Sequence, residues 1–195
     1  MKIAKHALLL LLASIVACNT TKTQARAPSD DGASAAMTTL ADEKGLPPDN
    51  ERVAVPGFDG ATSWLNVDHA LTLKELAGHV VVVDFWTSCC INCLQTLPTL
   101  SAVEDEHSND GVVVVGVHSP KFDAETERTR LADAVRQYSI RHPVAVDGSM
   151  KIWNAWGVDA WPTIVVLDTK GRAVWIGSGE PKRDELEAVI KSALA

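Results

Sequence analysis

Four consecutive valines, Val80–Val83, constrain the fold of this chain more than any other feature of its sequence. β-Branched side chains favour extended backbone, and an apolar run without polar alternation is typical of a strand that is covered on both faces. A second run of this kind follows at Val112–Val117. Strands of this type lie at the centre of α/β domains, where helices cover the sheet from both sides.

The segments around these strands alternate between helical and extended patterns. Between residues 90 and 107, leucines and a valine recur every three residues and predict a helix, in which Pro98 should produce a kink. Further helices are expected over 71–76 (capped by Thr72 and ended by Gly78), 124–138, 149–156 and 183–194, and further strands over 143–146, 163–167 and 173–176, the last two as an antiparallel hairpin. The fold class predicted is therefore a three-layer α/β/α sandwich with a mixed central sheet.

The N-terminal residues are typical of an export signal. Lys2 and Lys5 precede an apolar run that is too short to cross a bilayer as a helix and suits the central region of a secretory signal. The run ends in Ile15-Val16-Ala17-Cys18, which resembles the lipobox of bacterial lipoproteins. In that family the cysteine is lipidated and becomes the first residue. A plain signal peptide or an uncleaved anchor is the alternative.

This resemblance implies a signal peptide over 1–17, a lipid anchor on Cys18 and an exported protein on the periplasmic side of a bacterial membrane. Asn19, rather than aspartate, follows the cysteine and favours the outer membrane. Residues 18–56 are rich in Thr, Ala, Ser, Asp and Pro and are predicted to be a flexible tether, with the folded domain over 57–195. The net charge of −7, without a basic block, gives nucleic-acid binding little support.

The remaining three cysteines, Cys89, Cys90 and Cys93, lie where a buried strand meets a helix. The first turn of a helix offers unpaired N–H groups and a partial positive charge, which favour a thiolate. This predicts Cys90 as the nucleophile and Cys93, one turn further along and less exposed, as the resolving thiol. A zinc site needs about four ligands, and no second C-x-x-C or H-x-x-H exists, so neither a metal nor a cofactor is expected. A purely structural disulfide is the alternative, although so small a loop would stabilise little.

The segment Asp84-Phe85-Trp86-Thr87-Ser88-Cys89-Cys90-Ile91-Asn92-Cys93 resembles the active-site strand and helix of thioredoxin-like proteins, and Trp161-Pro162-Thr163 resembles their cis-proline loop. Within this superfamily the chain is similar to exported TlpA-like reductases, and above all to the thioredoxin-like domain of NHL-repeat-containing proteins, which has Cys-Cys-Ile-Asn-Cys. The resemblance covers about residues 60–195. It implies a thioredoxin-like fold and the activity of a thiol-disulfide oxidoreductase. The similarity to TlpA-like proteins implies that this enzyme acts as a reductase. Its partners would be protein disulfides or thiols, with a membrane electron donor upstream.

The resemblance also implies roles for single residues. Asp84 corresponds to the buried acid that moves protons for the resolving cysteine, and a carboxylate after four valines would be desolvated, which raises its pKa. Pro162 corresponds to the cis-proline beside the disulfide, and Trp161 would offer backbone hydrogen bonds to an extended partner chain. The side chain of Trp86 could line one side of this substrate-binding site. The alternatives are an aspartate that reaches solvent, a trans-proline loop and a tryptophan that only packs in the core.

Cys89 departs from the family, which often has tryptophan before C-x-x-C. It is a candidate accessory thiol, a site of adventitious oxidation or a buried apolar side chain. Two other functions remain open. Cys89 and Cys93 have the C-x-x-x-C spacing of Sco-like copper chaperones, with His118 as a candidate third ligand. Thr87 and Cys90 satisfy the T-x-x-C pattern of thiol peroxidases, but Val83 stands where that pattern has proline.

Overall fold

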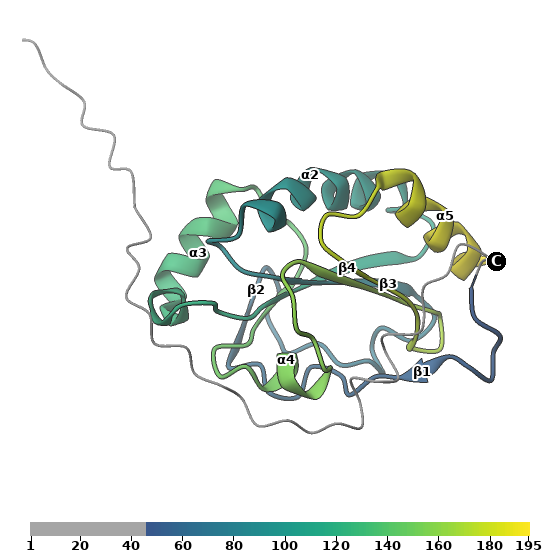
Figure 1. The fold of residues 1–195 in the computed structure, drawn as a ribbon, viewed down its shortest axis with the longest axis horizontal. Coiled ribbons are helices and arrows are strands. Elements are labelled where there is room, and N and C mark those ends of the chain that lie inside the picture. Colours follow the sequence, from purple (N-terminus) through teal and green to yellow (C-terminus); the bar gives the residue numbers. More distant parts are fainter. Residues whose placement is uncertain (1–45) are drawn as a thin grey trace, which may run out of the picture.

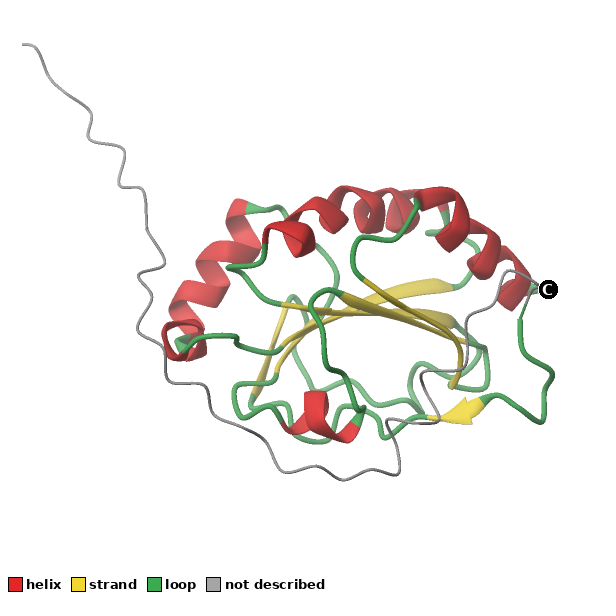
Figure 2. Ribbon diagram, viewed as in Figure 1, coloured by secondary structure: helices red, strands yellow, loops and turns green. Residues whose placement is uncertain are grey.

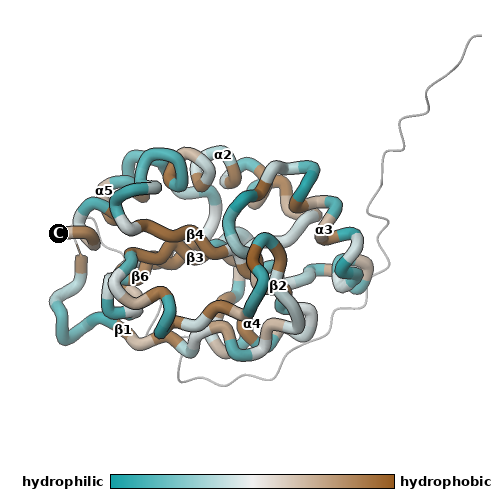
Figure 3. Tube along the Cα trace, turned by 180° about the vertical axis from the view of Figure 1, so that it is seen from behind, coloured by the Kyte–Doolittle hydropathy of each residue, from teal (hydrophilic) through white to brown (hydrophobic). Residues whose placement is uncertain are grey.

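The computed structural model describes residues 46–195. Its central strands are β3 (Val80–Trp86) and β4 (Val112–His118), which run parallel and in register. Every residue of β3 is buried, as the run of valines predicts. Figure 3 shows these two strands as the most hydrophobic part of the sheet.

The other strands extend this pair into a mixed sheet of the order β1-β7-β6-β3-β4-β5-β2. β6 pairs antiparallel with β3 and forms the predicted hairpin with β7, and β5 pairs parallel with β4. Two short strands that the sequence did not predict, β1 and β2, lie at the two edges. The bounds are β1 (Val53–Ala54), β2 (Ser63–Leu65), β5 (Val144–Val146), β6 (Thr163–Leu167) and β7 (Arg172–Ser178).

Helices cover both faces of this sheet (Figures 1 and 2). On one face lie α2 (Ile91–Glu106), α3 (Arg128–Gln137) and α5 (Arg183–Leu194), and on the other lies α4 (Lys151–Ala155). This arrangement confirms the three-layer α/β/α sandwich with a mixed sheet. Helix α2 runs on through Pro98.

Alternation along β3 decides which side chains lie beneath α2. Val80 and Val82 belong to the cluster that packs against Leu100 of α2, whereas Val81 and Val83 face the α4 side. Because side chains alternate along a strand, Asp84 falls on the same face as Val80 and Val82. The strand therefore places a carboxyl group beneath the helix that carries the cysteines.

The helix predicted over 71–76 is wrong, because the chain forms a series of turns there. The predicted cap is present: the Thr72 hydroxyl accepts the Glu75 N–H at 3.3 Å and donates to the Glu75 carboxylate at 2.7 Å. Gly78, at φ +88°, then turns the chain, and its N–H bonds the Thr169 carbonyl. The segment is too short to continue as a helix before β3 begins.

The helix predicted over 124–138 is divided in two. Residues Asp123–Thr126 form a 3₁₀ turn, and α3 begins only at Arg128. The break arises because Glu125 turns inward, and its carboxylate accepts the backbone N–H groups of Lys121 and Phe122.

The last part of the predicted tether is packed against the domain. β1 pairs with β7, and Arg172 at the start of β7 bonds the carboxylate of Asp49 at 2.6 Å. Arg52 bonds Asp168 at 3.1 Å. The sheet therefore begins at Val53, before the boundary predicted at residue 57. The predicted signal peptide 1–17, the lipidation site Cys18 and the tether up to residue 45 lie outside the described residues.

Over residues 46–195, the structure contains no helix with the length and apolar character needed to span a bilayer.

One buried histidine joins the ends of α2 and α5. His107, at the C-terminus of α2, bonds Glu187 of α5 at 3.0 Å and Asp110 at 3.1 Å. The bond to Glu187 raises the pKa of His107, against the opposing effect of burial. A raised folded-state pKa stabilises the fold fully below the unfolded pKa, about 6.5, and this contribution is lost as pH rises through the folded value.

We therefore expect the stability advantage of the wild type over His107→Gln to be largest at or below about pH 6 and to shrink as pH rises above neutrality. Urea unfolding of both proteins across this range, followed by tryptophan fluorescence, measures the difference. An advantage that grows with pH would contradict the protonated bridge.

Candidate active site

Cys90 lies directly before α2 and serves as its N-cap. Its sulfur accepts the N–H of Cys93 at 3.4 Å and donates toward the carbonyl oxygen of Trp161 at 3.8 Å. The side chain is half-buried, so a partner sulfur can approach it. The Cys90 sulfur therefore sits at the mouth of the helix, where unpaired N–H groups stabilise negative charge.

Cys93 lies one turn further along and is fully buried. Burial raises the pKa of its thiol, and the hydrogen bond with Cys90 and the nearby charge of Asp84 act in the same direction. Cys93 is therefore a thiol at neutral pH, and it needs a base before it can act as a nucleophile.

Asp84 provides a base in the right place. Its side chain is fully buried, and neither carboxyl oxygen has a hydrogen-bond partner among the described residues. Burial raises the pKa of Asp84 to about 8. The alternative of an aspartate that reaches solvent is wrong, and the group can hold or release a proton near neutral pH.

The predicted cis-proline is present, since the Trp161–Pro162 peptide bond is cis. The Trp161 ring stacks on Trp153 with 4.1 Å between centroids, and its Nε1 donates to the carbonyl of Ser119 at 3.1 Å. These contacts hold the Trp161 carbonyl against Cys90. Trp161 is itself partly exposed, so it can contact a partner chain.

Trp86 does not contribute to this surface. Its side chain is fully buried and packs with Cys93 and Leu97 in a cluster between the sheet and α2. The predicted substrate-binding role is therefore wrong, because alternation along β3 turns Trp86 inward on the face that carries Asp84. Among residues 46–195, Ile91 is the most exposed large apolar side chain, at 66%, and it adjoins Cys90.

Cys89 is exposed, so the interpretation of this residue as a buried apolar side chain is wrong. Its backbone N–H donates to Glu125 at 3.0 Å.

Glu125 is a site residue that the sequence analysis missed. Its carboxylate is 5% exposed and accepts hydrogen bonds from the Thr87 hydroxyl at 2.5 Å and the Ser88 hydroxyl at 2.7 Å, besides the N–H groups of residues 89, 121 and 122. It thus ties the loop before Cys90 to the loop after β4. The only signal in the sequence was one acidic residue in a charged segment, which is typical of a solvated helix face.

Burial alone would raise the pKa of Glu125, but the neighbouring His118 and the hydroxyls of Thr87 and Ser88 outweigh burial and lower it. The group therefore stays ionised, and His118 lies 3.9 Å from it. His118 is buried against Trp86 at 4.9 Å between ring centroids. Among residues 46–195, no group of three or more His, Cys, Asp or Glu side chains is arranged to hold a metal ion.

Comparison with known proteins places these features in a family. The model of the family described as thioredoxin-like matches residues 78–173. Human NHL repeat-containing protein 2 is 39% identical over 144 residues, which are 73% of this chain and 20% of that protein. The thiol-disulfide oxidoreductase ResA of Bacillus anthracis is 29% identical over 62% of this chain and 67% of its own length. The chain thus spans only about a fifth of the length of the NHL-repeat relative.

A solved structure assigned as the thiol:disulfide interchange protein DsbE of Chlorobium tepidum shares the fold, with a TM-score of 0.63. The match covers 74% of this chain and 97% of that one at 24% identity. The enzyme class predicted from the sequence is the class that ResA and this structure name. Residues 78–173 therefore form a thioredoxin-like domain, in agreement with the sequence and with the fold.

Proposed function

We propose that this chain is a thiol-disulfide oxidoreductase that acts on disulfides of partner proteins through Cys90 and Cys93. The observation that carries the proposal is the position of the Cys90 sulfur. It caps α2, accepts the Cys93 N–H at 3.4 Å and faces the Trp161 carbonyl of the cis-proline loop at 3.8 Å. An extended partner segment laid along this loop would bring its own disulfide against the exposed side of Cys90.

In the mechanism we propose, the Cys90 thiolate attacks one sulfur of the partner disulfide. The partner's S–S bond breaks, its other sulfur leaves and takes a proton, and a mixed disulfide forms. Cys93 then gives its proton to the Asp84 carboxylate and attacks the Cys90 sulfur. The Cys90–Cys93 bond forms, the mixed-disulfide bond breaks, and the second partner sulfur leaves and takes a proton. Two electrons have then passed from the cysteine pair to the partner.

We favour the reducing direction, in keeping with the TlpA-like resemblance. The Cys90–Cys93 disulfide must then be reduced again by a dithiol donor, and an exported reductase in an oxidising compartment needs one that is supplied across the membrane. Cys89 is the accessory thiol in this scheme, exposed and next to the nucleophile.

We further propose export by the signal over 1–17 and attachment through lipid on Cys18, with the outer membrane favoured. The geometry of the fold supports a tethered domain. The described chain enters the sheet at β1, where Val53 pairs with Ala173. This pair lies at the end of the sheet where β3 begins. Cys90, by contrast, follows the opposite end of β3. The entry point and the nucleophile are thus separated by roughly 15–20 Å along the strands.

The full-length chain should accelerate the reduction of insulin disulfides by dithiothreitol and should fractionate with membranes of a Gram-negative host. Cys18→Ala should keep the catalytic rate and should no longer incorporate labelled fatty acid, because the lipid is separate from the chemistry. Turbidity of reduced insulin and fatty-acid labelling of both proteins provide the test. Absence of acceleration would refute the oxidoreductase, and an unlabelled wild type would refute the lipid anchor.

A further inference from the structure

Three unpartnered polar groups are buried together beneath α2. Besides Asp84, these are the indole Nε1 of Trp86 and the Nε2 of His142, which have no hydrogen-bond partner among the described residues. A fourth such atom, the Nε2 of His118, faces Glu125 at 3.9 Å. His142 is 4% exposed, and Trp86 is fully buried. A buried polar atom without a partner costs about 1–3 kcal/mol, so such a group of three points to a function.

Gly116 is the point at which these groups meet. A Cβ atom on Gly116 would lie 3.1 Å from Trp86 Nε1 and 3.3 Å from His142 Nε2. Gly116 is also the cross-strand partner of Asp84, about 4.8 Å away along the sheet. The absence of a side chain therefore lets the indole and the imidazole approach the strand closely beside the Asp84 carboxyl, and buried polar groups without partners are the setting in which proteins hold a bridging water.

These groups complement one another as hydrogen-bond donors and acceptors. The Nδ1 of His142 lies 3.3 Å from the Glu104 carboxylate of α2 and donates to it, which leaves Nε2 as an acceptor. Trp86 can only donate, and a protonated Asp84 also donates. A water that bridges the three groups would accept from Asp84 and Trp86 and donate to His142, which satisfies all three groups.

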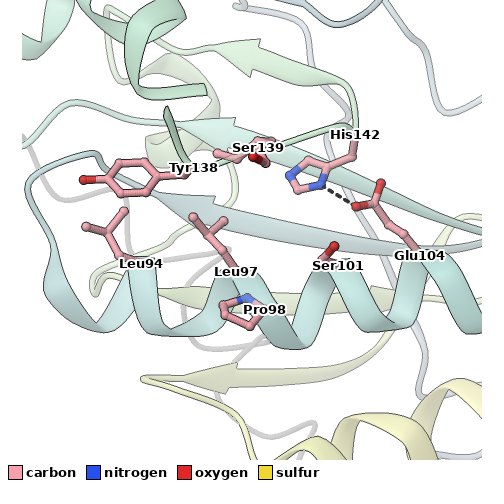
Figure 4. Close-up of a pocket in the computed structure, with 9 residues that line it drawn as sticks. Leu94, Leu97, Pro98, Ser101, Glu104, Tyr138, Ser139 and His142 are labelled. Carbon is pink, nitrogen blue, oxygen red and sulfur yellow. Dashed lines mark hydrogen bonds and ion pairs between the residues drawn. The ribbon is translucent and has the colours of Figure 1, made fainter. Parts of the chain in front are cut away.

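Glu104 connects this buried group to the surface. Together with His142 it forms one end of a pocket of about 270 Å³ between α2 and the segment that leads from α3 to β5 (Figure 4). Leu94 and Leu97 of α2 and Tyr138 line the rest of it. The Glu104 side chain is 20% exposed, so its carboxylate can exchange protons with solvent.

We propose that His142 and Glu104 form a proton relay that carries the proton of Asp84 out to solvent. Asp84 releases its proton through the bridging water to His142 Nε2, the Nδ1 proton passes to Glu104, and Glu104 releases it into the pocket. One proton leaves and no electron moves. The relay rests on the proposed function, because it prepares Asp84 to accept the proton of Cys93.

A relay is required because Asp84 is buried and cannot exchange its proton directly with solvent. With a pKa of about 8, Asp84 is mostly protonated at neutral pH, and in that form it cannot accept the Cys93 proton. Its proton must first leave a site without direct contact with water. The titratable and charged groups around His142 are Glu104 of α2, which bonds it, Tyr138, which lines the same pocket, Arg141, which lies 3.9 Å from Glu104, and Asp84, which is paired with Gly116.

Both chemical steps can be timed separately in a Cys89→Ser background of the full-length chain, with dithionitrobenzoate as the disulfide. The first thionitrobenzoate released reports the attack by Cys90, and the second reports the attack by Cys93. We expect His142→Gln and Glu104→Gln to slow the second release about tenfold at pH 7 and to leave the first unchanged. The slowing should shrink as pH rises through about 8, because Asp84 is then already ionised.

Glu106→Gln is the matched control, since Glu106 is also on α2 but pairs with Arg183 outside the pocket. It should keep both rates. Unchanged second releases in His142→Gln and Glu104→Gln, or a slowing that is equal at every pH, would overturn the relay. If Asp84→Asn alone slows the second release, the proposed function stands and the relay falls. A wild type that releases no second thionitrobenzoate would overturn both.

Discussion

Cys90→Ser should abolish catalysed reduction of protein disulfides, whereas Cys89→Ser should retain most of the wild-type rate. The reason is geometric: the Cys90 sulfur caps α2 and faces the cis-proline loop. A hydroxyl in its place is a far weaker nucleophile at neutral pH. Insulin reduction by the two variants, measured beside the wild type, tests the assignment.

Cys93→Ser is the companion variant. It should still attack a partner disulfide but should accumulate the mixed disulfide, because no resolving thiol remains. Retained activity in Cys90→Ser would contradict the assignment and would transfer the nucleophile to Cys89. Far-ultraviolet circular dichroism of each variant verifies that the fold is intact.

The second large effect is expected at Glu125, where an alanine should destabilise the domain by about 3 kcal/mol or more. This change leaves two hydroxyls and three backbone N–H groups without their acceptor in a buried site. Such a loss is a large share of the roughly 5–15 kcal/mol that holds a domain together. Urea unfolding measures it.

Glu125→Gln separates shape from charge, since its amide keeps one acceptor oxygen. It should recover part of the lost stability, and disulfide reduction should recover with it, because the loop before Cys90 regains its support. Glu127→Ala is the control, because Glu127 is exposed and pairs only with exposed Arg130, so about 0.5 kcal/mol or less is expected. Equal stability of Glu125→Ala and Glu127→Ala would contradict the role of Glu125 as a support.

The sequence predicts those parts of the fold whose pattern is local. The continuous apolar runs of β3 and β4 and the three-residue spacing in α2 extend over enough residues to be recognised. The edge strands β1 and β2 have two and three residues, which is too short for any period to appear. Over 71–76, a local capping signal is present but no helix forms, because the segment is too short to continue as a helix before β3 begins.

The residues of the candidate site also differ in whether a local motif marks them. Cys90, Cys93 and the cis-proline loop follow from short motifs, and their positions together agree with the resemblance. Glu125 could not be found in this way, because its partner Thr87 lies 38 residues away and no motif links them. The inward position of Trp86 could have been inferred from strand alternation, which places it on the face of Asp84.

The most direct test of the central claim is the site of attachment in the trapped intermediate. Cys93→Ser is allowed to react with a peptide that contains one disulfide, the product is digested without reduction, and the cross-linked fragment is sequenced by tandem mass spectrometry. The partner sulfur should be found on Cys90. Its presence on Cys89 instead would contradict the assignment of the sulfur at the mouth of α2 as the nucleophile.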